Sequence, residues 1–210
     1  MKISGGKTEN GIGFGNTYDK YGSRNPIVQR MMAGFEKSLT QFVTYASPKS
    51  IHEIGCGEGH WVTGWNAKGY NARGCDFSHQ VIDIAKENAA KLNLFKNNFK
   101  VRSIYDLDSK EDCADLIVCC EVLEHLEDPI AGLSALQSVT DNYIILSVPR
   151  EPLWRVLNLS RGKYLSNWGN TPGHLQHWSK KEFVDLLQRY FKIISVESPL
   201  PWTMVLCQKK

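Results

Sequence analysis

Apolar residues return along the chain with two alternating spacings, one typical of helices and one typical of strands. Over residues 26–46 they recur every three to four positions, and Pro26 suits the first turn of a helix. After that helix, short apolar runs alternate with further helical patterns. We expect strands over 50–54, 71–75, 99–104, 115–120, 143–148, 192–196 and 202–207, and helices over 58–68, 78–92, 129–138 and 180–190.

The order of these elements predicts how they assemble. Strands and helices alternate, and the run 115–120 is almost wholly apolar, as a strand covered on both faces should be. Such an alternation predicts an α/β fold, with a mostly parallel seven-stranded sheet and helices on both faces. No repeat or linker interrupts the pattern, so we expect a single domain over 1–210.

Two stretches depart from this rhythm. Residues 1–25 are rich in glycine, asparagine, lysine and tyrosine and have no period, so we expect an arm that is ordered on demand. Its Tyr18, Tyr21 and Arg24 are lesser candidates for closing over a ligand. Residues 150–178 hold many aromatic side chains, two prolines and no clear period. A long connection of this kind is usually functional.

Composition then narrows the class of protein. Hydrophobic residues make up 42% and charged residues 22% of the 210, which is ordinary for a globular chain. The net charge of +3 is small and scattered, which argues against binding long nucleic acid. No apolar run approaches the ~18 residues of a membrane helix, and the N-terminus shows no apolar leader. The six cysteines follow no zinc or redox spacing, so we expect a soluble, cytoplasmic protein.

A glycine-rich loop, Glu-Ile-Gly-Cys-Gly-Glu-Gly at 53–59, follows the first strand of the predicted sheet. Glycines let a backbone turn tightly and approach a ligand, and ligands bind at the carboxyl ends of such strands. The dinucleotide fingerprint G-x-G-x-x-G would need a glycine where His60 stands. A carboxylate at Glu53 suits a cationic ligand better than a pyrophosphate. Asp76, at the end of the next strand, stands where a carboxylate accepts hydrogen bonds from both ribose hydroxyls.

Three motifs together resemble a known family. Residues 53–59, Gly-Cys-Asp-Phe-Ser at 74–78, and Asp-Leu-Ile-Val-Cys-Cys-Glu-Val-Leu-Glu-His-Leu-Glu-Asp-Pro at 115–129 resemble successive motifs of class I S-adenosylmethionine-dependent methyltransferases. The third motif is particularly similar to that of ubiquinone-biosynthesis O-methyltransferases. The resemblance covers about residues 15–208. It implies a Rossmann-like class I methyltransferase fold that uses S-adenosylmethionine.

The resemblance also implies roles for individual residues. Glu53 would reach the methionine amino group of the cofactor, Asp76 would hold the ribose, and Phe77 would pack on the adenine. Many relatives carry Gly-Asp after the third strand, whereas this chain reads Arg-Ser-Ile, so Ser103 or the amide of Ile104 would contact the adenine. The expected cofactor-binding residues are Glu53, Gly55, Cys56, Gly57, Asp76, Phe77, Ser103, Ile104 and Glu121.

Glu121, Glu124 and His125 stand at positions i, i+3 and i+4, so a helix would bring all three onto one face. Acidic residues in a first turn can simply complement the helix dipole. Alternatively, this face takes part in catalysis, with a histidine as the general base. The catalytic candidates are then Glu121, His125 and a later histidine, either His174 or His177. Glu-x-x-Glu-His with a distant histidine also resembles the small-RNA terminal 2′-O-methyltransferases, in which it holds Mg²⁺. The implied metal ligands are Glu121, Glu124, His125 and His174.

Residues 150–178 fall where this family builds the lid over its methyl acceptor. The aromatic residues of this insertion favour a planar or lipophilic small-molecule acceptor, although such residues also commonly cover a core. Its basic residues favour an acidic group or a peripheral contact with a membrane surface. These residues are Trp154, Tyr164, Trp168, Arg155, Arg161 and Lys163.

The sequence therefore predicts transfer of a methyl group to an oxygen of a small molecule, such as a phenol, a quinol or a sugar hydroxyl. The alternatives are Mg²⁺-dependent methylation of an RNA 3′ end and N- or C-methylation of a small metabolite. A dehydrogenase is disfavoured by His60 at the third glycine position. A non-catalytic cofactor-binding protein is disfavoured by the polar residues on the presumed acceptor face.

Overall fold

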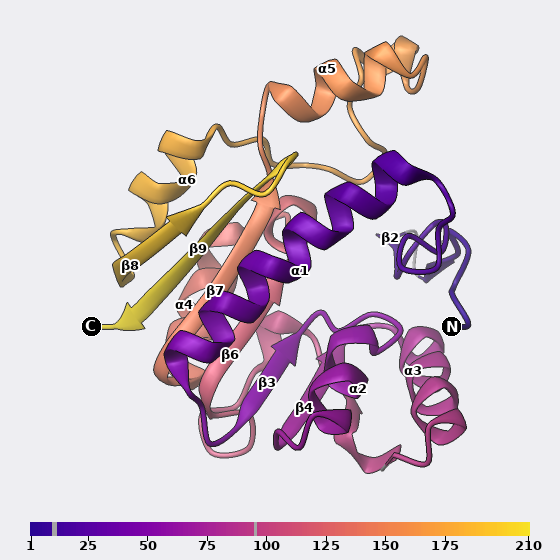
Figure 1. Ribbon diagram of the computed structural model, residues 1–210. Coiled ribbons are helices and arrows are strands. Elements are labelled where there is room, and N and C mark those ends of the chain that lie inside the picture. The colour runs from indigo at the N-terminus through magenta and orange to yellow at the C-terminus, as the bar shows by residue number, and fades with distance from the viewer. Residues whose placement is uncertain (10–11, 95) are drawn as a thin grey trace.

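The computed structural model describes residues 1–9, 12–94 and 96–210. A seven-stranded sheet in the order β5-β4-β3-β6-β7-β9-β8 forms its centre, and helices cover both faces (Figure 1). The strands are β3 (Ile51–Ile54), β4 (Ala72–Asp76), β5 (Phe99–Val101), β6 (Ala114–Cys120), β7 (Thr140–Pro149), β8 (Phe191–Glu197) and β9 (Trp202–Lys209). The helices are α1 (Pro26–Ala46), α2 (His60–Ala67), α3 (His79–Lys91), α4 (Pro129–Val139), α5 (Leu153–Ser160) and α6 (Lys180–Leu187).

The strand order determines where a ligand can bind. Strands β5, β4, β3, β6 and β7 are parallel, and β9 runs antiparallel between β7 and β8. Because β4 lies on one side of β3 and β6 on the other, the order reverses at β3, and ligands bind beyond the carboxyl ends at such a point. The first residue of the antiparallel β9, Trp202, pairs with Pro149 at the end of β7 and so reaches the same edge.

Two apolar layers, one on each face, hold the sheet. Helices α1, α2 and α3 share one layer with side chains such as Leu39, Val62 and Val81. Helices α4 and α6 share the other, with Leu133 and Phe183 at its centre. Strands β3 and β6 send buried residues into both layers, which explains why the sequence of β6 is a nearly continuous apolar run after Asp115. The predicted α/β class, with its mostly parallel seven-stranded sheet, is confirmed.

Two element boundaries differ from the sequence-based expectation for local reasons. Strand β5 ends at Val101, not at 104, because the Ser103 hydroxyl accepts a hydrogen bond from the Tyr105 amide and opens a 3₁₀ turn, η2 (Ile104–Asp106). Helix α2 begins at His60, not at 58, because the glycine loop continues to that point.

The insertion 150–178 also differs from expectation, because it contains helix α5 and a 3₁₀ turn, η4 (Leu165–Asn167). Eight residues flanked by proline and aromatic side chains are too few to display a period in the sequence. In Figure 1, α5 stands out from the body of the molecule above the carboxyl edge of the sheet.

The N-terminal arm is docked in this structure. Its short strands β1 (Thr8–Glu9) and β2 (Ile12–Gly13) pair antiparallel, and the side chains of Ser4 and Phe14 are buried. None of the helices in the described ranges combines the length and the apolar character that crossing a membrane requires.

Candidate active site

The glycine loop between β3 and α2 lies at the carboxyl edge of the sheet and is built of left-handed turns. A side-chain carbon on Gly55, whose φ is 78°, would lie 2.3 Å from a methyl group of Val122. Gly57 is also left-handed, and its N–H donates to Asp76 Oδ2 at 3.1 Å. Cys56 is buried between them. The loop is therefore joined to the end of β4, as a shared ligand site requires.

Two buried carboxyl groups flank this loop. Glu53 is 4% exposed, and its Oε2 has no hydrogen-bond partner within the described ranges. Burial raises the pKa of Glu53 well above its usual value, because the charged form loses its hydration. Asp76 accepts from the Ser78 and Gly57 amides, yet burial still raises its pKa to about 6. Neither carboxyl group forms an ion pair with a described residue, so both are suited to polar or cationic ligand groups.

The remaining expected cofactor contacts lie along the same edge. Phe77 follows β4 and is 36% exposed, so its ring has a free face. Ser103 caps the turn after β5, with its hydroxyl oxygen accepting from Tyr105 N–H at 3.3 Å. The Ile104 side chain packs into the core, so only its backbone is a candidate for contact with a ligand.

Glu121 comes directly after β6 but does not share a helix with Glu124 and His125. Its φ is 60°, and the 3₁₀ turn η3 (Leu123–His125) starts two residues later. The Glu121 carboxylate accepts from Ser147 Oγ at 3.0 Å and from the Trp202 indole N–H at 2.5 Å. Burial raises its pKa to about 7, although these two hydrogen bonds oppose the rise. The predicted common face of three residues is therefore wrong for Glu121.

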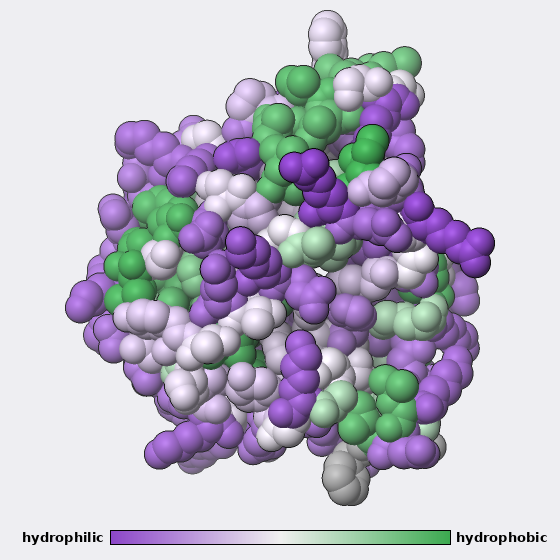
Figure 2. Space-filling view, viewed as in Figure 1, coloured by the Kyte–Doolittle hydropathy of each residue, from purple (hydrophilic) through white to green (hydrophobic). Residues whose placement is uncertain are grey.

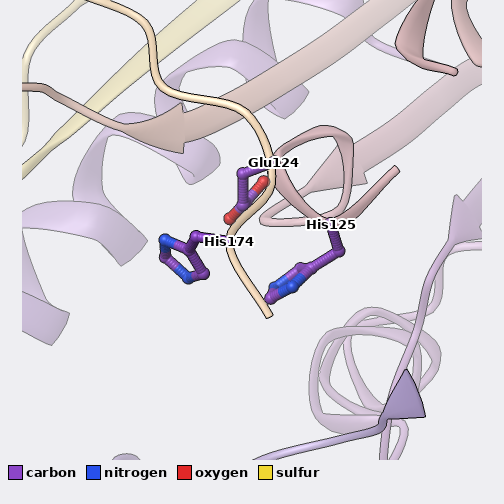
Figure 3. A group of neighbouring side chains, drawn as sticks. All are labelled: Glu124, His125 and His174. Carbon is purple, nitrogen blue, oxygen red and sulfur yellow. The ribbon is translucent and has the colours of Figure 1, made fainter. Parts of the chain in front are cut away.

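Glu124, His125 and the later His174 form a cluster. Each offers one ligand atom, and these atoms lie within 4.8 Å of one another (Figure 3). Glu124 is 2% exposed, and both of its carboxylate oxygens lack a partner in the part of the chain that the structure describes. Burial, together with the charge of Glu121, raises the pKa of Glu124 well above its usual value. A buried carboxyl without a partner has to carry a proton or meet a cation.

The surroundings favour the neutral form of both imidazoles, although His125 is exposed at the surface and His174 is buried. Burial lowers the pKa of His125, and it lowers that of His174 to about 3 with help from the neighbouring His125. The His125 Nδ1 lies 2.9 Å from the Gly173 carbonyl oxygen, which can only accept, so Nδ1 carries the proton. The rings of His125 and His174 meet edge to face, with centroids 4.9 Å apart. The cluster can thus accept a proton or bind a divalent cation.

Backbone contacts explain why His174, not His177, joins the cluster. The amides of Leu175 and Gln176 both donate to the Glu124 carbonyl, at 2.8 and 3.0 Å, and hold residues 173–176 against η3. His177 instead lies 2.8 Å from the side chain of Asn170. The sequence left these two histidines open, and the structure brings only His174 to the turn after β6.

Sequence reasoning missed the residues that support this edge from other elements. The Trp202 indole N–H donates to Glu121, and the centroids of the Trp202 and Trp154 rings are 6.2 Å apart. The Trp154 ring in turn stacks on that of His174, with centroids 5.9 Å apart. A tryptophan at the start of an antiparallel strand gives no signal of this kind, because its partner lies 81 positions earlier in the chain. The sheet topology alone brings them together.

Glu58, inside the glycine loop, was also missed, and it holds the N-terminal arm. Its side chain is buried and accepts four hydrogen bonds: from Ser4 N and Oγ at 3.0 and 2.8 Å, and from Asn16 N and Nδ2 at 2.7 and 2.5 Å. Farther along the arm, Tyr21 stacks on His60 with ring centroids 3.5 Å apart. The arm therefore lies directly on the glycine loop.

Known proteins share this architecture. A family model described as a methyltransferase domain matches residues 29–196, which is most of the chain. The chain belongs to this methyltransferase family. Its class I fold, expected from the three motifs, is confirmed, and solved structures of that fold include one with bound SAH. The match to a methyltransferase family sets the dehydrogenase alternative aside.

Curated relatives of this methyltransferase include ubiquinone biosynthesis O-methyltransferases. The protein from Rickettsia canadensis is 29% identical over 163 residues, which are 74% of this chain and 64% of the relative. That from Alkalilimnicola ehrlichii is 25% identical over 158 residues, 69% of this chain and 63% of the relative. The alignments thus span somewhat less than two thirds of the relatives' length.

Solved structures show the same fold at lower identity. Magnesium protoporphyrin IX methyltransferase from Synechocystis PCC 6803, crystallised with bound SAH, superposes with a TM-score of 0.68 at 19% identity, over 90% of both chains. The methyltransferase domain of bacterial CtHen1 superposes with a TM-score of 0.65 at 19% identity, over 85% of this chain and 99% of that one. These two methyltransferases carry different names but have the same fold, so the likeness shows the fold of this chain alone.

Proposed function

We propose that this methyltransferase moves the sulfonium methyl group of S-adenosylmethionine to an oxygen of a small-molecule acceptor. The observation that carries the proposal is the hydrogen bond that fixes the ring of His125. Its Nδ1–H donates to the Gly173 carbonyl at 2.9 Å, which leaves a lone pair on Nε2 beside the carboxyl edge of the sheet. The curated relatives, which are O-methyltransferases by name, support oxygen as the acceptor atom.

The residues at the ends of β3 and β4 fit the cofactor. Glu53 has a buried oxygen without a partner in the described ranges, and the ammonium group of the methionine part would satisfy it. Asp76 would accept hydrogen bonds from the ribose hydroxyls. The free face of Phe77 would pack against the adenine. At the end of β5, the hydroxyl group of Ser103 and the backbone amide of Ile104 would donate hydrogen bonds to the edge of the adenine ring.

S-adenosylmethionine supplies an already activated methyl group, so the protein mainly has to align the acceptor and exclude water. The acceptor oxygen forms a bond to the methyl carbon while the carbon–sulfur bond breaks and leaves its electron pair on sulfur. The proton of the acceptor hydroxyl must also leave, and Nε2 of His125 would take it. Because burial lowers the pKa of His125, the ring is ready to accept that proton at neutral pH.

A divalent cation such as Mg²⁺ is a second candidate, and Glu124 is the observation that favours it. The two partnerless oxygens of this buried carboxyl group fit a cation, and the neutral rings of His125 and His174 would complete the ligand set. Such a cation would lower the pKa of the acceptor hydroxyl. Glu121, already bonded to Ser147 and Trp202, stands outside this group. In this version a terminal RNA ribose joins the list of acceptors.

A chelator distinguishes the two versions. With a cation, chelation abolishes turnover but leaves cofactor binding unchanged, and added Mg²⁺ or Mn²⁺ restores activity. With a free base, the chelator has no effect, and activity falls only below the ordinary histidine pKa of 6.5, because the pKa of His125 is lowered. His177→Ala is the matched control, since this ring lies outside the cluster. Full activity in both His125→Ala and His174→Ala, without metal dependence, contradicts both versions.

The insertion 150–178 supports a lipophilic acceptor and a contact with an anionic membrane surface. Its apolar side chains include Trp168, 80% exposed, Leu165, 63%, and Val156, 55%. Figure 2 shows apolar residues gathered over α5 at the top of the view. Arg155, Arg161 and Lys163 lie in the same segment. Sedimentation with vesicles of anionic and of neutral lipid tests the contact, and Trp168→Ser should reduce binding to the anionic vesicles.

The acceptor itself can be identified directly. Incubating the protein and labelled S-adenosylmethionine with an extract of its source, followed by mass spectrometry of the labelled product, gives the acceptor and the methylated atom. An O-methylated phenol, quinol or sugar supports the proposal. A product methylated on nitrogen or carbon contradicts the choice of oxygen and leaves the methyl transfer intact.

A further inference from the structure

Glu121 is held in an unusual way at the end of the central strand β6. Its backbone is left-handed, a conformation that is unfavourable for a residue with a side chain and that clusters at functional sites. Each carboxylate oxygen has its own donor: Ser147 Oγ binds Oε1 at 3.0 Å, and Trp202 Nε1 binds Oε2 at 2.5 Å. Two donors on two oxygens fix both the position and the plane of the carboxylate, and they oppose the rise that burial causes in its pKa.

Trp202 is in turn fixed by its surroundings. It is 5% exposed, and its ring lies edge-on to Phe35 of α1 at 5.1 Å and tilted against Trp154 of α5 at 6.2 Å. The indole N–H therefore has one direction available, toward Glu121. Ser147 is fully buried on the adjacent β7.

The Glu121 carboxylate forms no ion pair with a described residue, although the charge of Lys20 acts on it from farther away and lowers its pKa. None of the ion pairs among the described residues includes Glu121, Glu53 or Glu124. Strand β6 lies beside β3, so Glu121 stands next to the strand whose Glu53 would receive the methionine ammonium. On the proposed function, Asp76 at β4 would hold the ribose and the cluster after β6 would hold the acceptor, so the sulfonium would lie between them. A fixed, unpaired carboxylate at that point faces a cation before methyl transfer and a neutral thioether afterwards.

We propose that Glu121 recognises the positive charge of the sulfonium, and that Trp202 and Ser147 are the positioning residues that hold its carboxylate there. The site then discriminates between the charged substrate, S-adenosylmethionine, and the neutral product, S-adenosylhomocysteine. Loss of the charge on methyl transfer removes the attraction and favours release of the product. This inference rests on the proposed function, because it takes the orientation of the cofactor from it.

Calorimetric binding of the two ligands tests the inference without measuring turnover. In Glu121→Gln the amide oxygen can still accept from Trp202 while its NH₂ group donates to Ser147, so the change removes little but charge. We expect the Kd for S-adenosylmethionine to rise at least about tenfold, while that for S-adenosylhomocysteine stays within about twofold. Sinefungin, which carries an ammonium in place of the sulfonium, should follow S-adenosylmethionine.

Trp202→Phe keeps the apolar packing and removes the indole donor. It should lower the selectivity between the two ligands roughly threefold, in the same direction as Glu121→Gln. Trp65→Phe, a change at an equally buried tryptophan of α2, should leave the selectivity unchanged. Ser147→Ala removes the other donor and should act like Trp202→Phe, which covers the case in which Trp202→Phe does not fold.

Equal weakening of both ligands in Glu121→Gln, or no weakening of either, overturns the inference and leaves the methyltransferase assignment standing. A wild-type chain that binds neither ligand overturns the proposed function as well.

Discussion

Replacing Glu58 by glutamine should release the N-terminal arm from the glycine loop. The Glu58 carboxylate accepts four hydrogen bonds from Ser4 and Asn16. A glutamine keeps one acceptor oxygen, but its NH₂ group opposes the amide donor of Asn16. One hydrogen bond is then lost and the others lose their charge assistance. Charged hydrogen bonds contribute about 1 kcal/mol more than neutral ones, so the three remaining bonds alone should weaken arm docking by about 3 kcal/mol, and the lost bond adds to this minimum.

That free energy corresponds to a roughly hundredfold higher population of the undocked arm. Hydrogen exchange at the amides of residues 2–8 and 14–16 measures it directly, and the dissociation rate of S-adenosylhomocysteine should rise with it. Glu87→Gln is the matched control, since Glu87 pairs with Lys2 of the same arm at an exposed site, where an ion pair contributes little. Unchanged exchange in Glu58→Gln, or an equal change in Glu87→Gln, would refute the reasoning.

The pH dependence of arm docking follows from the same contacts. Burial alone would raise the pKa of Glu58, but the hydrogen bonds from Ser4 and Asn16 outweigh it and hold the pKa below its usual 4.5. A lowered carboxyl pKa contributes stability that is present above the usual value and lost as the pH falls through the lowered one. We therefore expect the arm to stay docked at neutral pH and to detach only below about 4.5.

Three further changes probe the remaining parts of the site. Asp76→Ala should weaken binding of S-adenosylmethionine by about 2–3 kcal/mol in calorimetry, because the ribose hydroxyls lose a charged acceptor; unchanged affinity with an intact fold would contradict the cofactor assignment. Gly55→Ala should abolish cofactor binding and lower the melting temperature, because its new methyl group would lie 2.3 Å from Val122; a variant that binds normally would show that the loop can shift. The buried Glu124 stabilises the folded state only while its carboxyl group is protonated, so the wild-type protein should lose stability as the pH rises above the usual glutamate pKa of 4.5. Glu124→Gln has no such group to ionise and should lose less stability over the same range. Thermal unfolding of both proteins between pH 5 and 8 measures that difference, and parallel curves would contradict it.

Local pattern was sufficient to predict the fold. Helix α1 begins at Pro26 and α3 is capped by Ser78, as the sequence predicts, because both signals act within one helical turn. The parallel sheet also followed from local information, since strands alternate with helices along the chain and the central β6 is almost wholly apolar. Those parts depend on neighbours in the chain.

The support of the candidate site depends on contacts distant in sequence, and those could not be predicted. Glu121 was expected on a helix, but its left-handed backbone points the carboxylate toward Ser147 and Trp202, which come from β7 and β9. Likewise, no periodic pattern signals that Glu58 binds the arm. Such contacts depend on how strands and loops pack together. The sequence predicts which strands and helices form, but it does not predict which distant side chains meet.

The antiparallel course of β9 has a consequence for how the site forms during synthesis. Every other strand that supports the site precedes the insertion 150–178, whereas Trp202 follows it. A nascent chain in which β3 to β7 have already folded thus holds Glu121 with one of its two donors missing. The Glu121 carboxylate therefore gains its second donor only when β9 enters the sheet. Selective binding of the charged ligand then begins only after the last strand has folded.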